Sequence, residues 1–438
     1  MRWFITTLLL TLSTACGRTT LPCEPSTCSG CCDGYGNCQA GTVNEECGVG
    51  AKGCVFCARG ATCTQGLCLG GMTAGGTSGT GGGRAGGAAG GGAAGGVAPG
   101  GKVIGARTFA PDVMLVVDRS GSMLQSLNPM DPQCRGCTTN CPPGCLTRSQ
   151  ALLTSMERFL STSGTDARFG LVLFPSNASC GSPSVVSPPI PMSDDSSVLA
   201  MNASAATTQL RSTSFSGGTP TSLALKFAAA DSAFTIDTRR EHFMVLVSDG
   251  VPNCNPSNPA TCMTPQTCQC TVASCAGQNC VIGCLDRQAA LDALTLAKTK
   301  DISTFVVGFG PDATTEVFNA LAVAGGRSLS CAQGLNECGT GNPCLAAAGT
   351  CARQFSNELN AGLSRVGEAA RRSGTCRFVL DEAVALDARL EVRVNGLVVS
   401  RGADGWQAER ADVVRFGGTV CAALTSTPST QVTFTLMP

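Results

Sequence analysis

The sequence predicts that residues 110–373, the largest part of the chain, form an α/β domain with a doubly wound, mostly parallel β-sheet. Apolar runs of about strand length alternate there with segments whose apolar residues recur at helical spacing. This alternation is typical of a parallel sheet that helices cover on both faces. A small disulfide-rich module is expected before this domain, and a small all-β unit after it.

Strands and helices are expected in alternation along the central domain. The expected strands are residues 112–117, 169–174, 243–247 and 304–309. A helix should begin at Thr147 and Gln150, which have the spacing of a capping box. Further helices are expected after Pro220, which suits a first helical position, and at residues 286–298, 314–323 and 356–371.

The N-terminus has the pattern of an export signal. Residues 1–15 combine a positive start at Arg2 with a short apolar stretch, and small residues precede Cys16. Ser13-Thr14-Ala15-Cys16 is similar to a bacterial lipobox, except that Ser13 stands where leucine is usual. We interpret residues 1–15 as a signal peptide and Cys16 as a lipidation site in a bacterial outer-membrane or cell-surface protein. The alternative is a plain secreted or periplasmic protein.

Residues 16–68 form a separate cysteine-rich module. Ten cysteines lie between residues 23 and 68, with almost no aliphatic core between them, so the module needs disulfides for stability. Its two C-x-x-C pairs could mimic zinc knuckles, but export favours disulfides. Residues 69–101 are rich in glycine and alanine, which predicts a flexible linker.

Composition narrows the classes of function. The chain has 29 cysteines and one histidine, so zinc and iron enzymes that need several imidazoles are disfavoured. His242 itself is interpreted as a strand-edge residue rather than a ligand. The formal net charge is zero and aromatic residues are few, which argues against nucleic-acid binding. After the N-terminus, no apolar run is long enough to span a membrane.

Residues 375–438 differ in pattern from the central domain. Short β-like runs such as RLEVRV and QVTFTL are separated by Asn395-Gly396 and Gly417-Gly418, which are turn signals. Cys376 and Cys421 could close this part as a pair. We therefore expect a small all-β unit, whose function the sequence does not indicate.

Polar residues follow the ends of two predicted strands. Asp118, Ser120 and Ser122 follow the first strand, within the segment VVDRSGSM, and Asp249 follows the strand that ends at Val247. Between them Thr219 lies in a glycine turn, SGGTPT, that leads into a helix. If the two strands are neighbours, five oxygen ligands meet at one edge of the sheet. Such hard ligands suit Mg²⁺, Mn²⁺ or Ca²⁺. The alternative is a set of polar loop residues in a metal-free fold.

The order and spacing of these five residues resemble the metal-ion-dependent adhesion site (MIDAS) of von Willebrand factor type A (VWA) domains. The resemblance covers roughly residues 110–373 and implies a Rossmann-like sheet with the metal at its top edge. It implies that Ser120, Ser122 and Thr219 present oxygens to the ion, while Asp118 and Asp249 act mainly through bound water. Because neutral hydroxyls leave the ion electrophilic, an open position could accept a carboxylate from a partner.

The remaining cysteines follow predicted strands in groups. Four lie at residues 134–145 and four at 331–351, while Cys180 stands apart from seven at 254–284. Because seven is odd, we expect Cys180 to pair with a cysteine of the 254–284 insertion. All groups are expected near the metal-bearing end of the sheet. There they would form either a stapled collar that selects partners or a decoration that only adds stability.

These patterns predict an exported binding protein that engages a protein or cell-surface ligand through a divalent cation. The sequence has no Ser-His-Asp set and no G-x-S-x-G motif, so we do not expect an enzyme. A lipid on Cys16 would attach the chain to a membrane. The alternatives are a structural envelope protein in which the metal only stabilises the fold, or an accessory subunit of an enzyme.

Overall fold

The computed structural model describes the chain as two compact units, residues 1–92 and 93–438. In the first unit, the described segments lie between residues 28 and 69. The predicted signal peptide, Cys16 and residues 70–100 of the linker lie outside the described residues. In the second unit the described residues are 101–138, 141–177, 180–255, 285–331, 337–339, 341–345, 348–385, 389–427 and 430–438.

The described segments of the first unit are short paired strands. A disulfide joins Cys28 to Cys38, which fits a disulfide-rich module. One sheet has the order β2-β1-β5, and the other strands form the pairs β3-β4 and β6-β7. The strands are β1 (Cys31–Cys32), β2 (Cys38–Gln39), β3 (Thr42–Val43), β4 (Glu46–Cys47), β5 (Lys52–Gly53), β6 (Thr62–Thr64) and β7 (Leu67–Leu69).

The second unit contains the predicted parallel sheet. Its four strands have the order β11-β10-β12-β13, and every neighbouring pair is parallel. All residues of the two central strands, β10 and β12, are buried, which explains their uninterrupted apolar sequences. The strands are β10 (Asp112–Asp118), β11 (Arg168–Phe174), β12 (His242–Ser248) and β13 (Ile302–Gly308).

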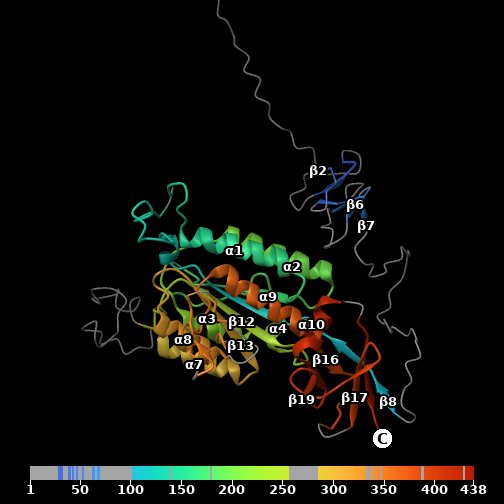
Figure 1. Ribbon diagram of the computed structural model, residues 1–438. Helices are drawn as coiled ribbons and strands as arrows, with labels where there is room; N and C mark the ends of the chain where they lie inside the picture. Colours follow the sequence, from blue (N-terminus) through green and yellow to red (C-terminus); the bar gives the residue numbers. More distant parts are fainter. Residues whose placement is uncertain are drawn as a thin grey trace, which may run out of the picture. The chain divides into compact units, whose positions relative to one another are not determined.

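Helices cover both faces of this sheet, so the doubly wound α/β fold is confirmed (Figure 1). Successive residues of β10 point to opposite faces. Val113, Leu115 and Val117 pack with one set of helices, and Met114 and Val116 pack with the other. The first set is α1 (Arg148–Ser163), α2 (Ser196–Arg211) and α9 (Leu359–Cys376). The second set is α3 (Thr221–Ala230), α4 (Ser232–Thr235), α7 (Arg287–Lys298) and α8 (Thr315–Gly325).

The starts of the helices show which sequence signals predicted a helix correctly. The predicted capping box is present: Thr147 accepts a hydrogen bond from the Gln150 backbone, and the Gln150 side chain accepts one from the Thr147 backbone. Pro220 is the residue before α3 rather than its first residue. Helix α2 was not predicted from the sequence, because its few buried residues are spread among alanines and polar side chains.

The C-terminal β unit contains strands that precede the α/β domain in the sequence as well as strands that follow it. Its two antiparallel sheets have the orders β19-β20-β16-β9 and β18-β17-β21-β8. Strands β8 (Lys102–Ile104) and β9 (Ala106–Thr108) precede β10, so the α/β domain is inserted between β9 and β16. The prediction of residues 375–438 therefore lacks two strands. The later elements are β16 (Arg377–Leu380), β17 (Leu390–Val394), β18 (Leu397–Val399), β19 (Trp406–Arg410), β20 (Val413–Phe416), α10 (Gly418–Ser426) and β21 (Val432–Leu436).

Local signals in the β unit agree with its structure. Asn395 and Gly396 both have positive φ and form the two-residue turn between β17 and β18. The predicted pair Cys376–Cys421 forms a disulfide. Helix α10 occupies residues for which only β structure was expected.

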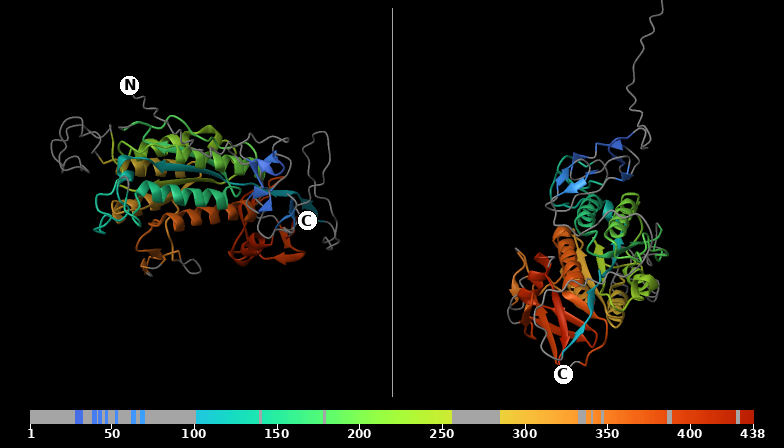
Figure 2. Two further views of the ribbon diagram at one scale, coloured as in Figure 1. Left: turned by 90° about the horizontal axis from the view of Figure 1, so that it is seen from above. Right: turned by 90° about the vertical axis from the view of Figure 1, so that its right-hand side faces the viewer.

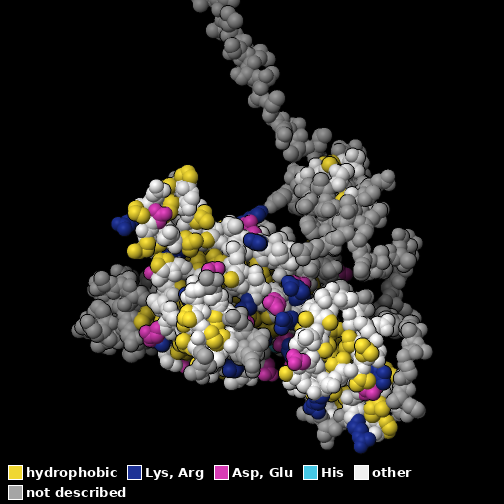
Figure 3. Space-filling view, viewed as in Figure 1, with side chains coloured by type: hydrophobic (Ala, Val, Ile, Leu, Met, Phe, Trp, Pro, Cys, Tyr) yellow, Lys and Arg dark blue, Asp and Glu magenta, His cyan; other side chains and the backbone are white. Residues whose placement is uncertain are grey.

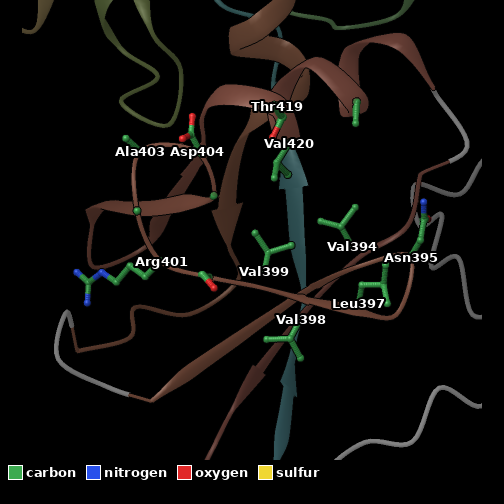
Figure 4. A pocket seen from close by; sticks show the side chains of 14 residues that line it. Val394, Asn395, Leu397, Val398, Val399, Arg401, Ala403, Asp404, Thr419 and Val420 are labelled. Atoms are coloured by element: carbon green, nitrogen blue, oxygen red, sulfur yellow. The ribbon is translucent and has the colours of Figure 1, made fainter. Parts of the chain in front are cut away.

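The β unit adjoins the amino ends of the parallel strands, opposite the carboxyl ends (Figures 1 and 2). There Arg415 pairs with Glu241, which immediately precedes β12, and Arg410 donates to the Thr238 carbonyl. Figure 3 shows hydrophobic side chains gathered on the face of the β unit turned to the viewer. An open groove of about 720 Å³ lies between β18 and the start of α10 (Figure 4). Among the described residues, no helix is both long and apolar enough to cross a membrane.

Candidate metal centre

The two predicted carboxylates lie at the same edge of the sheet. Asp118 is the last residue of β10, and Asp249 directly follows the neighbouring parallel strand β12. Asp118 is fully buried: its Oδ1 accepts from the Ser120 backbone N–H at 2.8 Å, and its Oδ2 accepts from Ser248 Oγ at 2.6 Å. The strand register therefore brings together two acids that lie 131 positions apart in the printed sequence.

The two serines connect these carboxylates. Ser120 precedes the short 3-10 helix η1 (Gly121–Leu124), and its Oγ lies 2.9 Å from Ser122 Oγ. Ser122 Oγ donates to Asp249 Oδ1 at 2.9 Å. Four of the five predicted ligands therefore form one continuous set of hydrogen bonds across β10 and β12.

Thr219 reaches this edge through its loop. The Gly217 carbonyl accepts from the Gly121 N–H at 2.9 Å, so the glycine turn lies against the loop of the two serines. Gly217 has φ +88°, a conformation that glycine adopts without strain. Thr219 is buried, and both of its backbone polar groups bond to Asn253. The SGGTPT segment thus belongs to the same site.

A buried arginine, Arg148, also belongs to the site. Its side chain is 2% exposed, and its Nη1 donates to Asp249 Oδ2 at 2.8 Å. Its Nη2 lies 2.7 Å from Asp312 Oδ2 and 3.2 Å from Gln125 Oε1. Arg148 is the first residue of α1, so one guanidinium joins the start of α1 to the loops after β12 and β13.

The electrostatics of the site favour an added cation. Burial, reinforced by repulsion from Asp249, raises the pKa of Asp118 from 3.8 to about 7. Burial also raises the pKa of Asp249, although Arg148 opposes this shift. Arg148 pairs with Asp249, whereas the carboxylate of Asp118 accepts from the neutral groups of Ser120 and Ser248. The hydroxyl and carboxylate oxygens are hard ligands, so the chemistry of these residues fits Mg²⁺, Mn²⁺ or Ca²⁺.

The raised pKa of Asp118 predicts how metal-free stability depends on pH. A carboxyl whose pKa is higher in the folded state than in the unfolded state stabilises the fold. This contribution is fully present when the pH is below the unfolded-state pKa of 3.8. That contribution is lost as the pH rises through about 7. In EDTA, the melting temperature should therefore fall between about pH 4 and about pH 7.

Thermal unfolding with and without Mg²⁺ checks this dependence. Asp118→Asn, which has no proton to lose, should flatten the fall in EDTA. In saturating Mg²⁺ the melting temperature should instead rise with pH over this range, because the cation binds the ionised carboxylate. An unchanged slope in Asp118→Asn would contradict the assignment to this residue.

The cysteine groups pair largely as expected. The predicted bond from Cys180 into the 254–284 insertion is confirmed as Cys180–Cys254. The other cysteines of that insertion lie outside the described residues. The groups of four pair internally, as Cys134–Cys145, Cys137–Cys141, Cys331–Cys344 and Cys338–Cys351.

The four cysteines at residues 331–351 lie beside the sheet rather than at its metal-bearing edge. The segment that carries them begins after Gly326 and ends before Ser356. Gly326 bridges to Thr304 and Ser356 bridges to Val307, so both ends of the segment lie alongside β13. Its short strands β14 (Cys344–Leu345) and β15 (Thr350–Cys351) pair with each other. His242 opens β12 at the amino end, with Nδ1 3.5 Å from Asp112 Oδ2, and is therefore remote from the candidate ligands.

Sequence reasoning missed Arg148 and Asn253. Asn253 lies in the same loop as Asp249, four residues on, which is the one local signal that pointed to it. Arg148 directly follows the capping residue Thr147, a place that indicates a helix start and not a partner for Asp249. Both contacts depend on how distant loops meet.

Comparisons with known proteins identify the fold. The family model of the von Willebrand factor type A domain matches residues 112–331, half of the 438 residues. No curated protein matches the sequence. The open form of the pilus adhesin SpaC from Lactobacillus rhamnosus GG is 14% identical, with 75% of this chain and 39% of that chain covered and a TM-score of 0.37. This chain thus spans about two fifths of that adhesin.

Two other solved structures are similar over most of their own length. The manganese-loaded TRAP protein of Plasmodium vivax is 15% identical, with 71% of this chain and 96% of that chain covered and a TM-score of 0.35. The vWF domain of the type V pili tip protein Mfa5 from Porphyromonas gingivalis is 14% identical, with 60% and 95% covered and a TM-score of 0.33.

Proposed function

This chain belongs to the von Willebrand factor type A domain family, and from that premise we propose that it is an exported binding protein of the adhesion type. Its ligand would be a protein or cell-surface molecule that donates a carboxylate to a divalent cation. We propose Asp118, Ser120, Ser122, Thr219 and Asp249 as the residues that hold this cation. The ion, Mg²⁺ or else Mn²⁺ or Ca²⁺, would supply an open coordination position for the carboxylate of the ligand.

The observation that carries this proposal is the continuous set of hydrogen bonds from Asp118 through Ser120 and Ser122 to Asp249. It gathers two buried carboxylates and two hydroxyls at the carboxyl ends of neighbouring parallel strands, where ligands bind in open α/β sheets. Buried acids without an equal number of buried bases attract a cation.

The disulfides support the proposed localisation. Bonds such as Cys180–Cys254 and Cys376–Cys421 persist in oxidising compartments and are rare in the cytosol. We propose that the chain is exported and anchored to a bacterial membrane by a lipid on Cys16, and that it is not an enzyme. Plain secretion remains the alternative to the anchor.

Metal-dependent capture tests the proposed function. Immobilised protein should retain a ligand from a cell-surface extract in Mg²⁺ and release it in EDTA. Ser120→Ala removes one proposed ligand oxygen and should lower capture by at least about tenfold, the cost typical of disturbing a metal site. The measurement is the amount of bound material with and without EDTA.

A matched serine variant separates this effect from a general loss of hydroxyls. Ser161→Ala changes a serine on α1 whose hydroxyl bonds to the Arg158 carbonyl, and it should capture like the wild type. A melting temperature that rises in Mg²⁺ without any capture would instead favour the structural envelope protein. Hydrolytic activity that survives Asp118→Ala would favour the enzyme subunit.

A further inference from the structure

Asn253 holds the backbone of Thr219 from both sides. The Thr219 N–H donates to Asn253 Oδ1 at 2.7 Å, and the Asn253 N–H donates to the Thr219 carbonyl at 3.0 Å. This pair of bonds fixes the peptide groups on either side of the Thr219 Cα. The direction of the Thr219 Cα–Cβ bond is then fixed, which limits the positions that the side-chain hydroxyl can take. No other described side chain accepts a hydrogen bond from the Thr219 N–H.

The next residue, Cys254, anchors Asn253 to a different strand. Cys254 is fully buried and is joined by a disulfide to Cys180, with the two Cα atoms 5.5 Å apart. Cys180 lies in the turn after β11, where the Ser176 N–H donates to the Gly181 carbonyl. Through this bond, the loop after β12 is tied to the loop after β11.

The conformation of Cys254 shows that this anchor restrains the loop. Its φ is +67°, in the left-handed region that a residue with a side chain rarely adopts. Such a conformation is unfavourable for a residue with a side chain and persists only where surrounding structure imposes it. On the other side of Asn253, the Pro252 carbonyl accepts from the Asp286 N–H at 2.9 Å. Asn253 therefore sits between two fixed points.

We propose that Asn253 is a positioning residue of the metal site, and that the Cys180–Cys254 disulfide keeps it in place. Asn253 acts through Thr219 and does not itself contact the ion. The affinity of the site for a divalent cation then depends on this one disulfide. This inference rests on the proposed cation site, because Thr219 is one of its five ligands.

The disulfide makes full affinity a property of the exported chain. In exchange with a small-molecule disulfide, the thiols of Cys180 and Cys254 become one disulfide, and the oxidant leaves as two thiols. No further reactant is needed, since the two protons and two electrons pass to the oxidant. Before this exchange, the loop around Asn253 is held only by the hydrogen bond from the Asp286 N–H to the Pro252 carbonyl.

The test measures Mn²⁺ binding to the full chain by calorimetry and by the electron paramagnetic resonance of free Mn²⁺. Asn253→Ala should weaken Mn²⁺ affinity by about 10- to 100-fold, the range for residues that orient metal ligands. Asn253→Asp keeps an oxygen acceptor for the Thr219 N–H. It should bind at least as tightly as the wild type, because it also adds negative charge.

A double-mutant cycle identifies the route of the effect. If Asn253 acts through Thr219, then Thr219→Val should weaken Mn²⁺ affinity in the wild type and add little in Asn253→Ala. Additive losses, or wild-type affinity in Asn253→Ala, would overturn the proposal. A wild-type chain that binds no Mn²⁺ would instead refute the proposed cation site itself, so the two failures are distinguishable.

The disulfide is tested with a matched pair of variants. Cys180→Ser/Cys254→Ser should weaken Mn²⁺ affinity about as much as Asn253→Ala. Cys137→Ser/Cys141→Ser removes a disulfide that closes a loop of only a few residues after η1 and should leave affinity unchanged. Equal affinities for the two pairs would overturn the role of Cys180–Cys254, even where Asn253→Ala itself is too unstable to purify.

Discussion

Replacing Arg148 with methionine is expected to lower the free energy of unfolding by about 3–5 kcal/mol in EDTA, the cost of breaking a buried ion pair. Both partners lie inside the protein, with side chains 2% and 0% exposed for Arg148 and Asp249. Methionine fills most of the space but leaves the Asp249 carboxylate without its cation. Denaturant unfolding at about pH 8, where Asp118 is ionised as well, gives the measurement.

The same experiment in saturating Mg²⁺ links this ion pair to the proposed metal. A bound divalent cation supplies positive charge beside Asp249, so the loss in Arg148→Met should become smaller in Mg²⁺ than in EDTA. An equal loss in both conditions would mean that no cation binds near Asp249.

Two further variants define the origin of the loss. Arg287→Gln breaks an ion pair with Glu316 whose side chains are 35% and 79% exposed, and it should cost less than about 1 kcal/mol. Arg148→Met/Asp249→Asn removes both charges and should recover much of the stability. A loss in Arg148→Met as small as that in Arg287→Gln would show that Asp249 has another source of compensation.

The core of the α/β domain could be predicted because its signals are local. A run such as Val113 to Val117 is apolar at every position because helices cover both faces of the strand. The Thr147 and Gln150 capping box likewise specifies a helix start within four residues. Helix α2 lacks such a signal, and its place is set by packing against α1 and β11 rather than by its own sequence.

The candidate ligands were also predictable, whereas the residues that hold them were not. Asp118, Ser120 and Ser122 stand at fixed spacing after a strand, so their grouping needs no knowledge of the fold. Arg148 contacts Asp249 across 101 positions, and Asn253 meets Thr219 across 34. Neither contact follows a spacing rule. Each depends on the strand order β11-β10-β12, which the sequence pattern alone does not determine.

The β unit illustrates a different limit. Each of its later strands has a clear pattern, but residues 102–108 are too short to be recognised as part of it. Their role becomes visible only in the pairing of Ile104 with Phe434 and of Phe378 with Thr108. The pairing crosses more than 260 positions of sequence because the α/β domain lies between the two parts.

Ile104→Ala is accordingly expected to destabilise the β unit by about 2–5 kcal/mol, the cost of removing a buried isoleucine side chain. Ile104 is 4% exposed and belongs to the core formed with Val392, Trp406, Phe434 and their neighbours. Trp406 is a local probe of this core, because the other tryptophan, Trp3, lies in the predicted signal peptide. Denaturant unfolding followed by Trp406 fluorescence therefore measures the loss directly.

Val103→Ala is the matched control, since Val103 is the preceding residue of the same strand and is 57% exposed. It should cost less than about 1 kcal/mol, because little apolar surface is lost from the core. Both substitutions shorten an aliphatic side chain in β8 and leave its backbone pairing with β21 intact. If both shifted the Trp406 transition equally, β8 would contribute only as an edge strand. A shift confined to Ile104→Ala would show that a side chain from the N-terminal side of the inserted domain stabilises the core of the β unit.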